Sequence, residues 1–346
     1  TAGHVTPNIA LLPALQAAGY EISYVGSYEG IEKKLIADFN IPYTGISTGK
    51  FRRYLDPKNF SDPFRVMKGF VEARNYLKNY QPDVVFSKGG FVSVPVVRAA
   101  ASLHIPCIIH ESDMTPGLAN KLCIPVAEKV CCNFPETMKN IPADKAVLTG
   151  SPIRAELAEG SKLAGLNMCG FTANKPVIMV IGGSLGAANV NKAVRDALPK
   201  LLEDFQVVHL CGKDKIDNLL LNTPGYKQFE YIKAELKDIF AMADVVISRA
   251  GANAICELLA LRKPNILIPL PAAASRGDQI LNANSFRSQG FSYVLEEEEL
   301  TNTTLLEAID HVFHKKDAYI DAMEHSKVTN SIETIMGLIR EASSHK

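Results

Sequence analysis

The chain has 346 residues, about twice the length of a typical domain, and its 47% hydrophobic and 21% charged residues exclude disordered and fibrous proteins. Lysine and arginine (37) balance aspartate and glutamate (37), so the net charge gives no support to nucleic-acid binding by the whole protein.

The cysteine pattern and the apolar runs indicate the compartment. Seven cysteines are scattered without a CxxC pair, which argues against a disulfide framework and fits a reducing cytoplasm. The adjacent Cys131 and Cys132 are expected to be small buried side chains. No apolar run approaches ~18 residues and the start lacks a signal-peptide pattern, so neither a membrane span nor a targeting segment is expected.

Short β-branched runs alternate with helical stretches, a pattern typical of βα units around parallel sheets. A strand is expected before Thr1, because a glycine-rich turn that opens a helix normally follows one. Strands are predicted in the first half at 21–27, 83–88, 106–111, 129–134 and 145–149. Strands are predicted in the second half at 176–182, 205–211, 227–232, 244–248, 265–270 and 291–295. Both halves therefore predict Rossmann-like α/β domains.

The boundary between the halves is placed in the segment 150–176, where glycine and proline are dense between two strand-rich blocks. We expect an N-terminal domain over 1–152 and a C-terminal domain over 153–325. A last helical segment, 326–346, is expected to return to the first domain.

The first glycine turn, Thr1 to Pro7, leads into a predicted helix at 9–17, with Thr6 as its N-cap and Pro7 at the first helical position. Such a turn is either a plain connection or a site whose N–H groups bind an anion or a sugar oxygen. His4 at its mouth favours a chemical role, because an imidazole can act as a general base near neutral pH.

Three further turns follow predicted strands of the second half. The sequence GGSLGA at 182–187 suits a diphosphate, but it lacks the GxGxxG spacing and the later acidic residue of dinucleotide sites, so hydride chemistry is disfavoured. In the turn at 248–257, Glu257 either binds ribose hydroxyls or is a solvated first-turn glutamate. Asp278 and Gln279 after the apolar loop at 269–277 either hold sugar hydroxyls or cap the next helix.

In the first half, the segments 87–93 (SKGGFVS) and 110–113 (HESD) each end a predicted strand, where open α/β sheets bind ligands. Metal binding by His110, Glu111 and Asp113 is not favoured, since successive strand residues point to opposite faces. A catalytic serine is equally unsupported, because no GxSxG elbow is present.

A resemblance to a known family rests on several of these motifs in register. TAGHVTPNIAL, SKGGFVSVP, HESDMTPGLANK, GSPIRAE, IGGSLGA, SRAGANAICELLALRKPNILIPLP and SRGDQILNA occur in this order, from Thr1 to beyond Phe291. They closely resemble the MurG family, bacterial glycosyltransferases that add N-acetylglucosamine (GlcNAc) to lipid I to make lipid II. The resemblance implies the α/β GT-B fold: two Rossmann-like parallel-sheet domains facing across a cleft, with C-terminal helices packing back on the first domain.

The resemblance also implies a role for each matching residue. The acceptor would bind mainly to the N-terminal domain and UDP-GlcNAc mainly to the C-terminal one. For the donor, Ser184 would hold the diphosphate, Glu257 the ribose, the backbone near Ile232 the uracil, and Gln279 with Asp278 the GlcNAc hydroxyls. The implied donor site further includes Thr1, Ala2, Gly3, Arg154, Ala252, Asn253, Ala254, Ile255 and Cys256. The implied acceptor side consists of Gly89, Gly90, Phe91, His110, Glu111 and Asp113.

The implied reaction is attack of the MurNAc C4 hydroxyl on the anomeric carbon of UDP-GlcNAc with inversion, and His4 is our candidate base. Helix N-termini and Arg249 would stabilise the departing UDP. No metal site and no required cofactor are expected, and stimulation by a divalent cation is left open. Asp113, Leu185 and Phe91 depart from residues common in the family, which puts fine acceptor contacts in doubt.

Because the implied acceptor is a lipid, we expect a peripheral protein on the cytoplasmic face of the cell membrane, with UDP-GlcNAc, lipid I and the membrane surface as partners. In the predicted helix at 62–80, one stripe is a core face and another is an apolar and basic face; a helix buried on two sides is the alternative. The core stripe consists of Val66, Phe70, Ala73 and Leu77. The candidate membrane patch consists of Phe64, Met67, Val71, Arg74 and Lys78, with Lys50, Phe51, Arg52 and Arg53 before it.

Other functions of the same fold remain open on the sequence. A glycosyltransferase that acts on diacylglycerol, a UDP-GlcNAc 2-epimerase and a non-catalytic sugar-nucleotide binder would share much of the nucleotide site. We also expect that the chain as given, without a strand before Thr1, is unstable or inactive.

Overall fold

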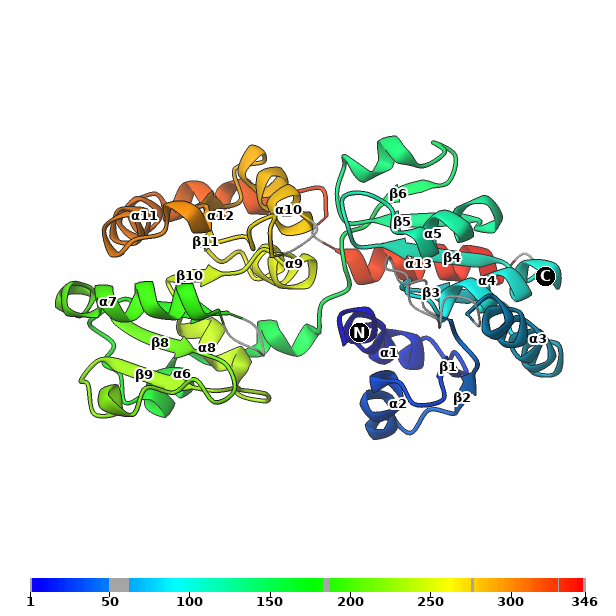
Figure 1. Cartoon of the computed structure of the whole chain (residues 1–346), viewed down its shortest axis with the longest axis horizontal. Helices are drawn as coiled ribbons and strands as arrows, with labels where there is room; N and C mark the ends of the chain where they lie inside the picture. The colour runs from blue at the N-terminus through cyan, green and yellow to red at the C-terminus, as the bar shows by residue number, and fades with distance from the viewer. Residues whose placement is uncertain (1, 50–61, 183–186, 275–276, 329, 345–346) are drawn as a thin grey trace. The chain divides into compact units, whose positions relative to one another are not determined.

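Residues 2–49, 62–182, 187–274, 277–328 and 330–344 are described by the computed structural model (Figure 1). The chain forms two units: unit 1 contains Thr1–Arg154 and Asn330–Lys346, and unit 2 contains Ala155–Thr329. The expected boundaries at 152/153 and 325/326 lie within a few residues of these divisions.

Unit 1 is built on two parallel sheets. The pair β1 (Tyr24–Ser27) and β2 (Tyr43–Ile46) forms one sheet, and a second has the order β3-β4-β5-β6. These last strands are β3 (Val85–Ser87), β4 (Cys107–Glu111), β5 (Lys129–Cys132) and β6 (Ala146–Leu148). The helices of unit 1 are α1 (Ala2–Ala17), α2 (Ile31–Ile36), α3 (Asp62–Tyr80), α4 (Ser93–Ser102), α5 (Leu118–Cys123) and α13 (Ser331–Ser343), with short 3₁₀ turns η1 (Ala37–Phe39), η3 (Ile124–Val126) and η4 (Thr137–Asn140).

The core of unit 1 lies on both faces of the β3–β6 sheet, as alternation along a buried parallel strand requires. On one face, Ile109 and Val130 pack with residues of α3 and α4 such as Val97. On the other face, Ile108 packs with Leu11 of α1 and with residues of α13. The last helix of the chain therefore belongs to the first unit, as expected, and Figure 1 draws it in red beside these strands.

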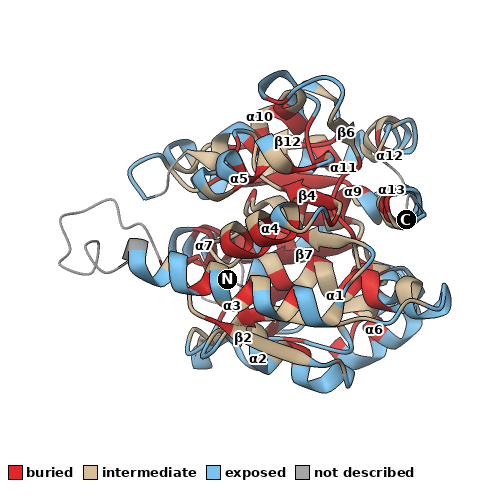
Figure 2. Ribbon diagram, turned by 90° about the vertical axis from the view of Figure 1, so that its right-hand side faces the viewer, coloured by how far each residue is buried: buried red, intermediate tan, exposed pale blue. Residues whose placement is uncertain are grey.

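Unit 2 holds one parallel sheet of order β12-β11-β10-β7-β8-β9. Its strands are β7 (Val177–Ile181), β8 (Gln206–Leu210), β9 (Tyr226–Phe229), β10 (Val245–Ser248), β11 (Asn265–Leu267) and β12 (Tyr293–Val294). Its helices are α6 (Lys162–Cys169), α7 (Ala188–Asp204), α8 (Leu236–Met242), α9 (Ala252–Ala260), α10 (Asp278–Ser288), α11 (Asn302–His314) and α12 (Lys316–Glu324), with 3₁₀ turns η5 (Ala155–Glu159), η6 (Asn218–Leu220) and η7 (Glu297–Glu299). Figure 2 shows β7 and β4, one from each unit, in the colour of buried residues.

Each segment predicted as a strand overlaps an observed strand, and β2 is a strand that we did not predict. The start of α1 corrects another expectation. The helix begins at Ala2, so Thr6 is not its N-cap and Pro7 lies inside it. Val5 is almost fully buried, and this packing favours helical structure before Pro7. The fixed φ of proline is compatible with a helix, although the helix loses one backbone hydrogen bond there.

All seven cysteines are free and buried, as expected for Cys131 and Cys132 in particular. Over the part of the chain that the structure describes, no helix has the combination of length and hydropathy needed to cross a bilayer.

Candidate functional site

In unit 1, residues at the carboxyl ends of β3 and β4 lie close together because these strands are neighbours in the sheet. Lys88 follows β3, and its Nζ lies 2.8 Å from Nδ1 of His110 and 2.6 Å from the Ser112 hydroxyl. Gly89 and Gly90 follow Lys88 with φ of +90° and +89°, a conformation that favours glycine. The motifs at 87–93 and 110–113 thus form one polar cluster.

His4 joins this cluster from α1. Its Nδ1 lies 3.2 Å from the carbonyl oxygen of Lys88, which can only accept a hydrogen bond, so Nδ1 carries the proton and Nε2 keeps a lone pair. Burial lowers the pKa of His4 below its ordinary value of 6.5. The ring also lies over Gly90, where an added Cβ would be 3.6 Å from Cδ2 of His4. This arrangement suits a general base that is neutral near pH 7.

His110 does not have the surface position that an acceptor contact requires. The side chain is 0% exposed; its Nε2 donates to the carbonyl oxygen of Gly150 at 2.8 Å, and its Nδ1 accepts from Lys88. Burial, together with the charge of Lys88, lowers the pKa of His110 well below its ordinary range, so the ring is neutral. His110 therefore supports the cluster from inside, and its expected place on the acceptor side stays a prediction.

Glu111 likewise supports the cluster from inside. It is 4% exposed, and its carboxylate accepts hydrogen bonds from the backbone of Asp113 (2.9 Å) and Gly117 (3.1 Å) and from the amide of Asn120 (2.8 Å). These bonds fix the loop between β4 and α5. Gly89, Gly90, Phe91 and Asp113 are only partly buried, so they remain candidates for contact with an acceptor.

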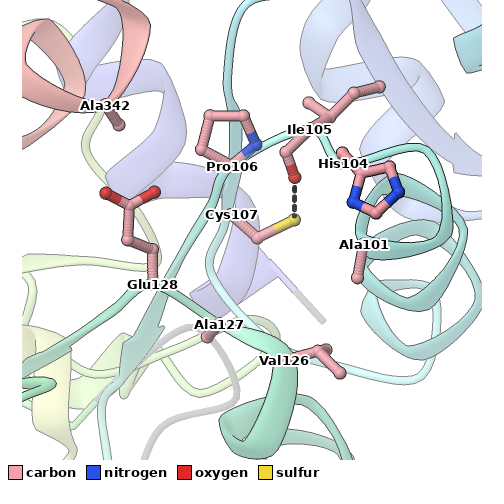
Figure 3. Close-up of a pocket in the computed structure, with 9 residues that line it drawn as sticks. All are labelled: Ala101, His104, Ile105, Pro106, Cys107, Val126, Ala127, Glu128 and Ala342. Atoms are coloured by element: carbon pink, nitrogen blue, oxygen red, sulfur yellow. Dashed lines mark hydrogen bonds between the residues drawn. The ribbon is translucent and has the colours of Figure 1, made fainter. Parts of the chain in front are cut away.

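A separate pocket of about 390 Å³ lies at the opposite edge of the same sheet, around the amino ends of β4 and β5 (Figure 3). Its lining includes Cys107, whose thiol donates to the carbonyl oxygen of Ile105 at 3.4 Å. Burial raises the pKa of Cys107 to about 12, so no thiolate is present at neutral pH. His104 and Glu128 also line this pocket, which lies apart from the His4 cluster.

In unit 2, the expected nucleotide contacts lie at the start of α9. Gly251 precedes this helix and provides no side-chain cap, so the first turn, Ala252 to Ala254, has the character of an anion site. Ile255 and Cys256 are buried, so we limit their expected contribution to the backbone. Glu257 is the sixth residue of α9 and is half-buried.

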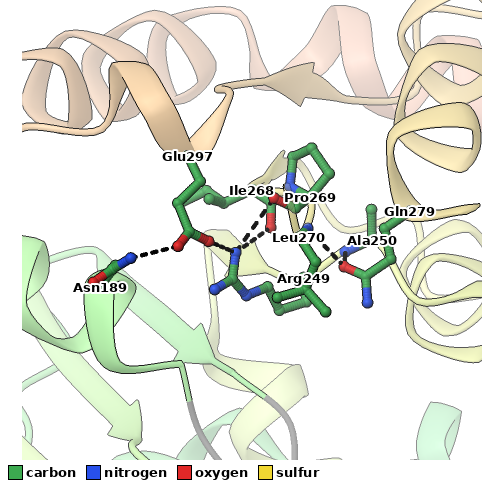
Figure 4. A network of polar contacts seen from close by, with 8 residues as sticks. All are labelled: Asn189, Arg249, Ala250, Ile268, Pro269, Leu270, Gln279 and Glu297. Atoms are coloured by element: carbon green, nitrogen blue, oxygen red, sulfur yellow. Dashed lines mark hydrogen bonds and ion pairs between the residues drawn. The ribbon is translucent and has the colours of Figure 1, made fainter. Parts of the chain in front are cut away.

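Gln279 connects the loops that follow the neighbouring strands β10 and β11 (Figure 4). Its Oε1 accepts hydrogen bonds from the backbone N–H groups of Ala250 (3.3 Å) and Leu270 (3.1 Å). The carbonyl end of the amide is thereby occupied, and the Nε2 end is left to donate to a ligand. Asp278 precedes it as the first residue of α10 and is half-buried.

Arg249 makes contacts within unit 2 that the sequence did not reveal. Its Nη1 forms an ion pair with Glu297 and donates to the carbonyl oxygens of Ile268 (3.1 Å) and Pro269 (3.4 Å). This guanidinium therefore supports the loops through Nη1, and its expected help to a departing phosphate stays a prediction. Glu297 and Lys88 were not assigned roles from the sequence; the only local signals are a run of four glutamates and a lysine at a strand end.

Some expected site residues are not placed by the structure. Thr1, Ser184 and the basic loop at 50–53 lie outside the described residues, as does the side chain of Ala2. Arg154 is the last residue of the first segment of unit 1, although we expected it in the C-terminal domain. Ile232 is buried, which leaves its backbone as the candidate for uracil contact. Within the described ranges, His, Cys, Asp and Glu side chains form no group of three suited to a metal ion.

Comparisons with known proteins cover nearly the whole chain. Residues 1–132 match the glycosyltransferase family 28 N-terminal domain, and residues 177–336 match the glycosyltransferase family 28 C-terminal domain. The UDP-N-acetylglucosamine–N-acetylmuramyl-(pentapeptide) pyrophosphoryl-undecaprenol N-acetylglucosamine transferase of Lachnoclostridium phytofermentans is 66% identical, with 99% of this chain and 96% of the relative covered.

Two solved structures extend the comparison. MurG of Acinetobacter baumannii matches with a TM-score of 0.77 and 26% identity, covering 98% of this chain and 96% of that chain. The UDP-GlcNAc 2-epimerase of Neisseria meningitidis, bound to UDP-GlcNAc, matches with a TM-score of 0.68, 13% identity and coverage of 99% and 98%. At that identity, the second likeness is one of fold alone.

Proposed function

The chain belongs to glycosyltransferase family 28, with the α/β GT-B fold, and we propose that it transfers GlcNAc from UDP-GlcNAc to lipid I to form lipid II. The observation that carries this proposal is the 66% identity, over 99% of the chain, to a relative named for that transfer. Lipid I is the undecaprenyl-pyrophosphoryl-MurNAc-pentapeptide acceptor that this name contains.

The proposed chemistry uses His4 as the base. The MurNAc C4 hydroxyl attacks C1 of GlcNAc while Nε2 of His4 takes the hydroxyl proton. The bond between C1 and the diphosphate oxygen breaks, and its electron pair leaves with UDP, so the configuration at C1 inverts. The hydrogen bond from Nδ1 to the Lys88 carbonyl supports this role, because it leaves Nε2 unprotonated.

Donor binding is assigned to unit 2. We propose that Glu257 binds the ribose, that the first turn of α9 and Ser184 bind the diphosphate, and that Gln279 with Asp278 binds the GlcNAc hydroxyls. The fixed amide of Gln279 supports its assignment, since its Nε2 can donate to a sugar oxygen while its Oε1 holds the loops. Arg154, the backbone of Ile232 and the segment Thr1 to Gly3 complete the proposed donor contacts.

We further propose that α3 binds the cytoplasmic face of the cell membrane, where the lipid acceptor resides. Phe64, Met67 and Val71 are 79%, 63% and 52% exposed, which argues against the alternative of a helix buried on two sides. Arg65, Lys68 and Lys78 are exposed on the same helix and would favour anionic lipids. The predicted core stripe is at least partly buried, and Ala73 and Leu77 are fully so.

The alternative functions receive less support. The epimerase is 13% identical to this chain, so that similarity is one of fold alone, whereas the relative named as a transferase is 66% identical. No observation favours a diacylglycerol acceptor over lipid I.

The test is transfer of labelled GlcNAc to a lipid I analogue by the purified chain, with a parallel reaction that contains UDP-GlcNAc alone. Transfer in the first reaction would support the proposal and would contradict the sequence-based expectation that the chain as given is inactive. In the second reaction we expect no change of the sugar. Replacement of His4 by Ala is expected to lower kcat about 100-fold, at the low end of the usual contribution of a general base. Epimerisation of UDP-GlcNAc without an acceptor would overturn the proposed function, and an unchanged kcat in His4→Ala would overturn the assignment of the base.

A further inference from the structure

Glu297 is the centre of a polar network in unit 2 (Figure 4). One carboxylate oxygen pairs with Nη1 of Arg249, and the other accepts a hydrogen bond of 2.5 Å from the amide of Asn189. The side chains of Arg249 and Glu297 are only 12% and 10% exposed, so this ion pair is largely removed from water. Arg249 extends the network to the carbonyl oxygens of Ile268 and Pro269.

The network joins the start of α7 to the segments that directly follow β10 and β11. Asn189 is the second residue of α7, directly after the segment that follows β7. Arg249 follows β10, and the two carbonyl groups follow β11. Because β11, β10 and β7 are adjacent in the sheet, Glu297 connects the ends of all three from its own position after β12.

A buried ion pair of this kind is weak evidence for stability, because removing two charges from water offsets much of their attraction. Its better-supported use is to favour one arrangement of the groups that it joins. Here those groups are the start of α7 and the residues directly after β10 and β11. Gln279 joins the last two segments through a separate pair of hydrogen bonds.

We propose that Glu297 is a positioning residue for the donor site, which holds the start of α7 and the residues directly after β10 and β11 in the arrangement that binds UDP-GlcNAc by pairing with Arg249 and Asn189. This inference rests on the proposed function for the identity of the donor. Glu297 acts through the loops and contacts no substrate itself.

The experiment measures UDP binding by calorimetry and the steady-state constants for UDP-GlcNAc in three variants of the full chain. Glu297→Gln removes the charge but keeps an acceptor for Asn189. Asn189→Ala removes the link to α7 and leaves the ion pair intact. The double variant Arg249→Met with Glu297→Met removes both charges at similar volume, a change that is often neutral for stability. Glu324→Gln is the matched control, because Glu324 pairs with Arg262 on the exposed surface of unit 2.

We expect Glu297→Gln and the double variant to weaken UDP binding and raise KM for UDP-GlcNAc about tenfold, equivalent to ~1.4 kcal/mol, with a smaller change in kcat. Asn189→Ala is expected to have a smaller effect in the same direction, and Glu324→Gln none. A merely structural role would leave KM and the UDP affinity of the folded double variant at wild-type values, and that result would overturn the proposal. Failure of the wild-type chain to bind UDP would instead count against the proposed function.

Discussion

Nζ of Lys88 lies 2.8 Å from Nδ1 of His110, and the backbone carbonyl of the same lysine accepts the hydrogen bond of His4. Lys88 is almost fully buried, so its ammonium group acts on both imidazoles through little water. The lysine charge disfavours protonation of His4, in addition to the larger effect of burial. The charge of Lys88 is therefore expected to influence the pH dependence of the reaction through the pKa of His4.

Replacement of Lys88 by Met is expected to raise the pKa of His4 toward 6.5. Because only unprotonated His4 can accept the acceptor proton, the acid limb of the kcat profile should move to higher pH, while kcat at alkaline pH changes less. The measurement is kcat for GlcNAc transfer between pH 5 and 9 in the wild type and the variant. Lys88→Arg keeps the charge and serves as the control; an acid limb at the same pH in Lys88→Met contradicts this electrostatic role.

The two proposed donor contacts are expected to respond differently to UDP and to UDP-GlcNAc. In Gln279→Glu, one carboxylate oxygen can still accept from Ala250 and Leu270, but no N–H remains to donate to a sugar hydroxyl. We expect about tenfold weaker binding of UDP-GlcNAc, in line with one lost hydrogen bond, and nearly unchanged binding of UDP. Glu257→Ala is expected to weaken both ligands, and calorimetry of each variant with each ligand distinguishes the two roles. Equal losses for UDP and UDP-GlcNAc in Gln279→Glu would refute a sugar contact.

Polar substitutions on the exposed face of α3 are expected to weaken membrane binding and to leave the fold intact. Serine at Phe64, Met67 and Val71 is expected to lower the fraction of protein that floats with anionic vesicles, since these side chains would no longer enter the interface. The control is Leu219→Ser, because Leu219 is an exposed apolar residue of unit 2. If the triple variant floats as the wild type does, α3 is not the membrane-binding element.

Because His209 is buried, we expect the free energy of unfolding to decrease in acid. Its Nε2 donates to Oδ1 of Asn191 (2.9 Å), and its Nδ1 accepts from the hydroxyl of Tyr226 (2.8 Å). Burial lowers the pKa of His209 from 6.5 to about 3, so the unfolded chain binds the proton more tightly than the folded protein. The stabilisation is complete above pH 6.5 and is lost progressively as the pH falls toward 3, by at most roughly 5 kcal/mol at ~1.4 kcal/mol per pKa unit.

His209→Gln should therefore flatten the decline of unfolding free energy with falling pH, although the variant is less stable at pH 7.5. Urea unfolding at pH 7.5, 6.0 and 5.0 measures this difference. His314→Gln, an exposed histidine on α11, is the control. An unchanged pH slope in His209→Gln would show that this histidine is not responsible.

The fold was largely predictable because buried runs rich in β-branched residues mark central strands such as β7 (Val177–Ile181) and β10 (Val245–Ser248). The strand β2 (Tyr43–Ile46) was not predicted; it is a four-residue edge partner of β1, and only Ile46 of its residues is buried. Tertiary packing explains the glycine at position 45, because a Cβ added to Gly45 would lie 2.7 Å from a ring carbon of Tyr28. The start of α1 was mispredicted for a related reason, because burial of Val5 outweighs the local signals of Thr6 and Pro7.

Candidate residues could be chosen from the sequence where the chemistry is local to one turn, as at His4, whereas contacts between distant partners could not be predicted. The roles predicted for Glu257 and Gln279 came from the family resemblance. The supporting contacts of His110 with Gly150 and of Arg249 with Glu297 join residues 40 and 48 positions apart, and no sequence spacing encodes them. The burial of His110 and Glu111 was equally hidden in the sequence, because it depends on the assembled sheet and loop.

The return of α13 to unit 1 sets an order for folding during synthesis. Ile335 and Ile339 of α13 complete the apolar layer that Leu11 and Ile108 begin, whereas all residues of unit 2 lie between these two contributions. Unit 2 can therefore fold on the ribosome while the first unit still exposes one face of its sheet. Nascent unit 1 must keep that face from aggregation until the final helix leaves the exit tunnel, so chaperone binding during translation should be directed at this half of the protein.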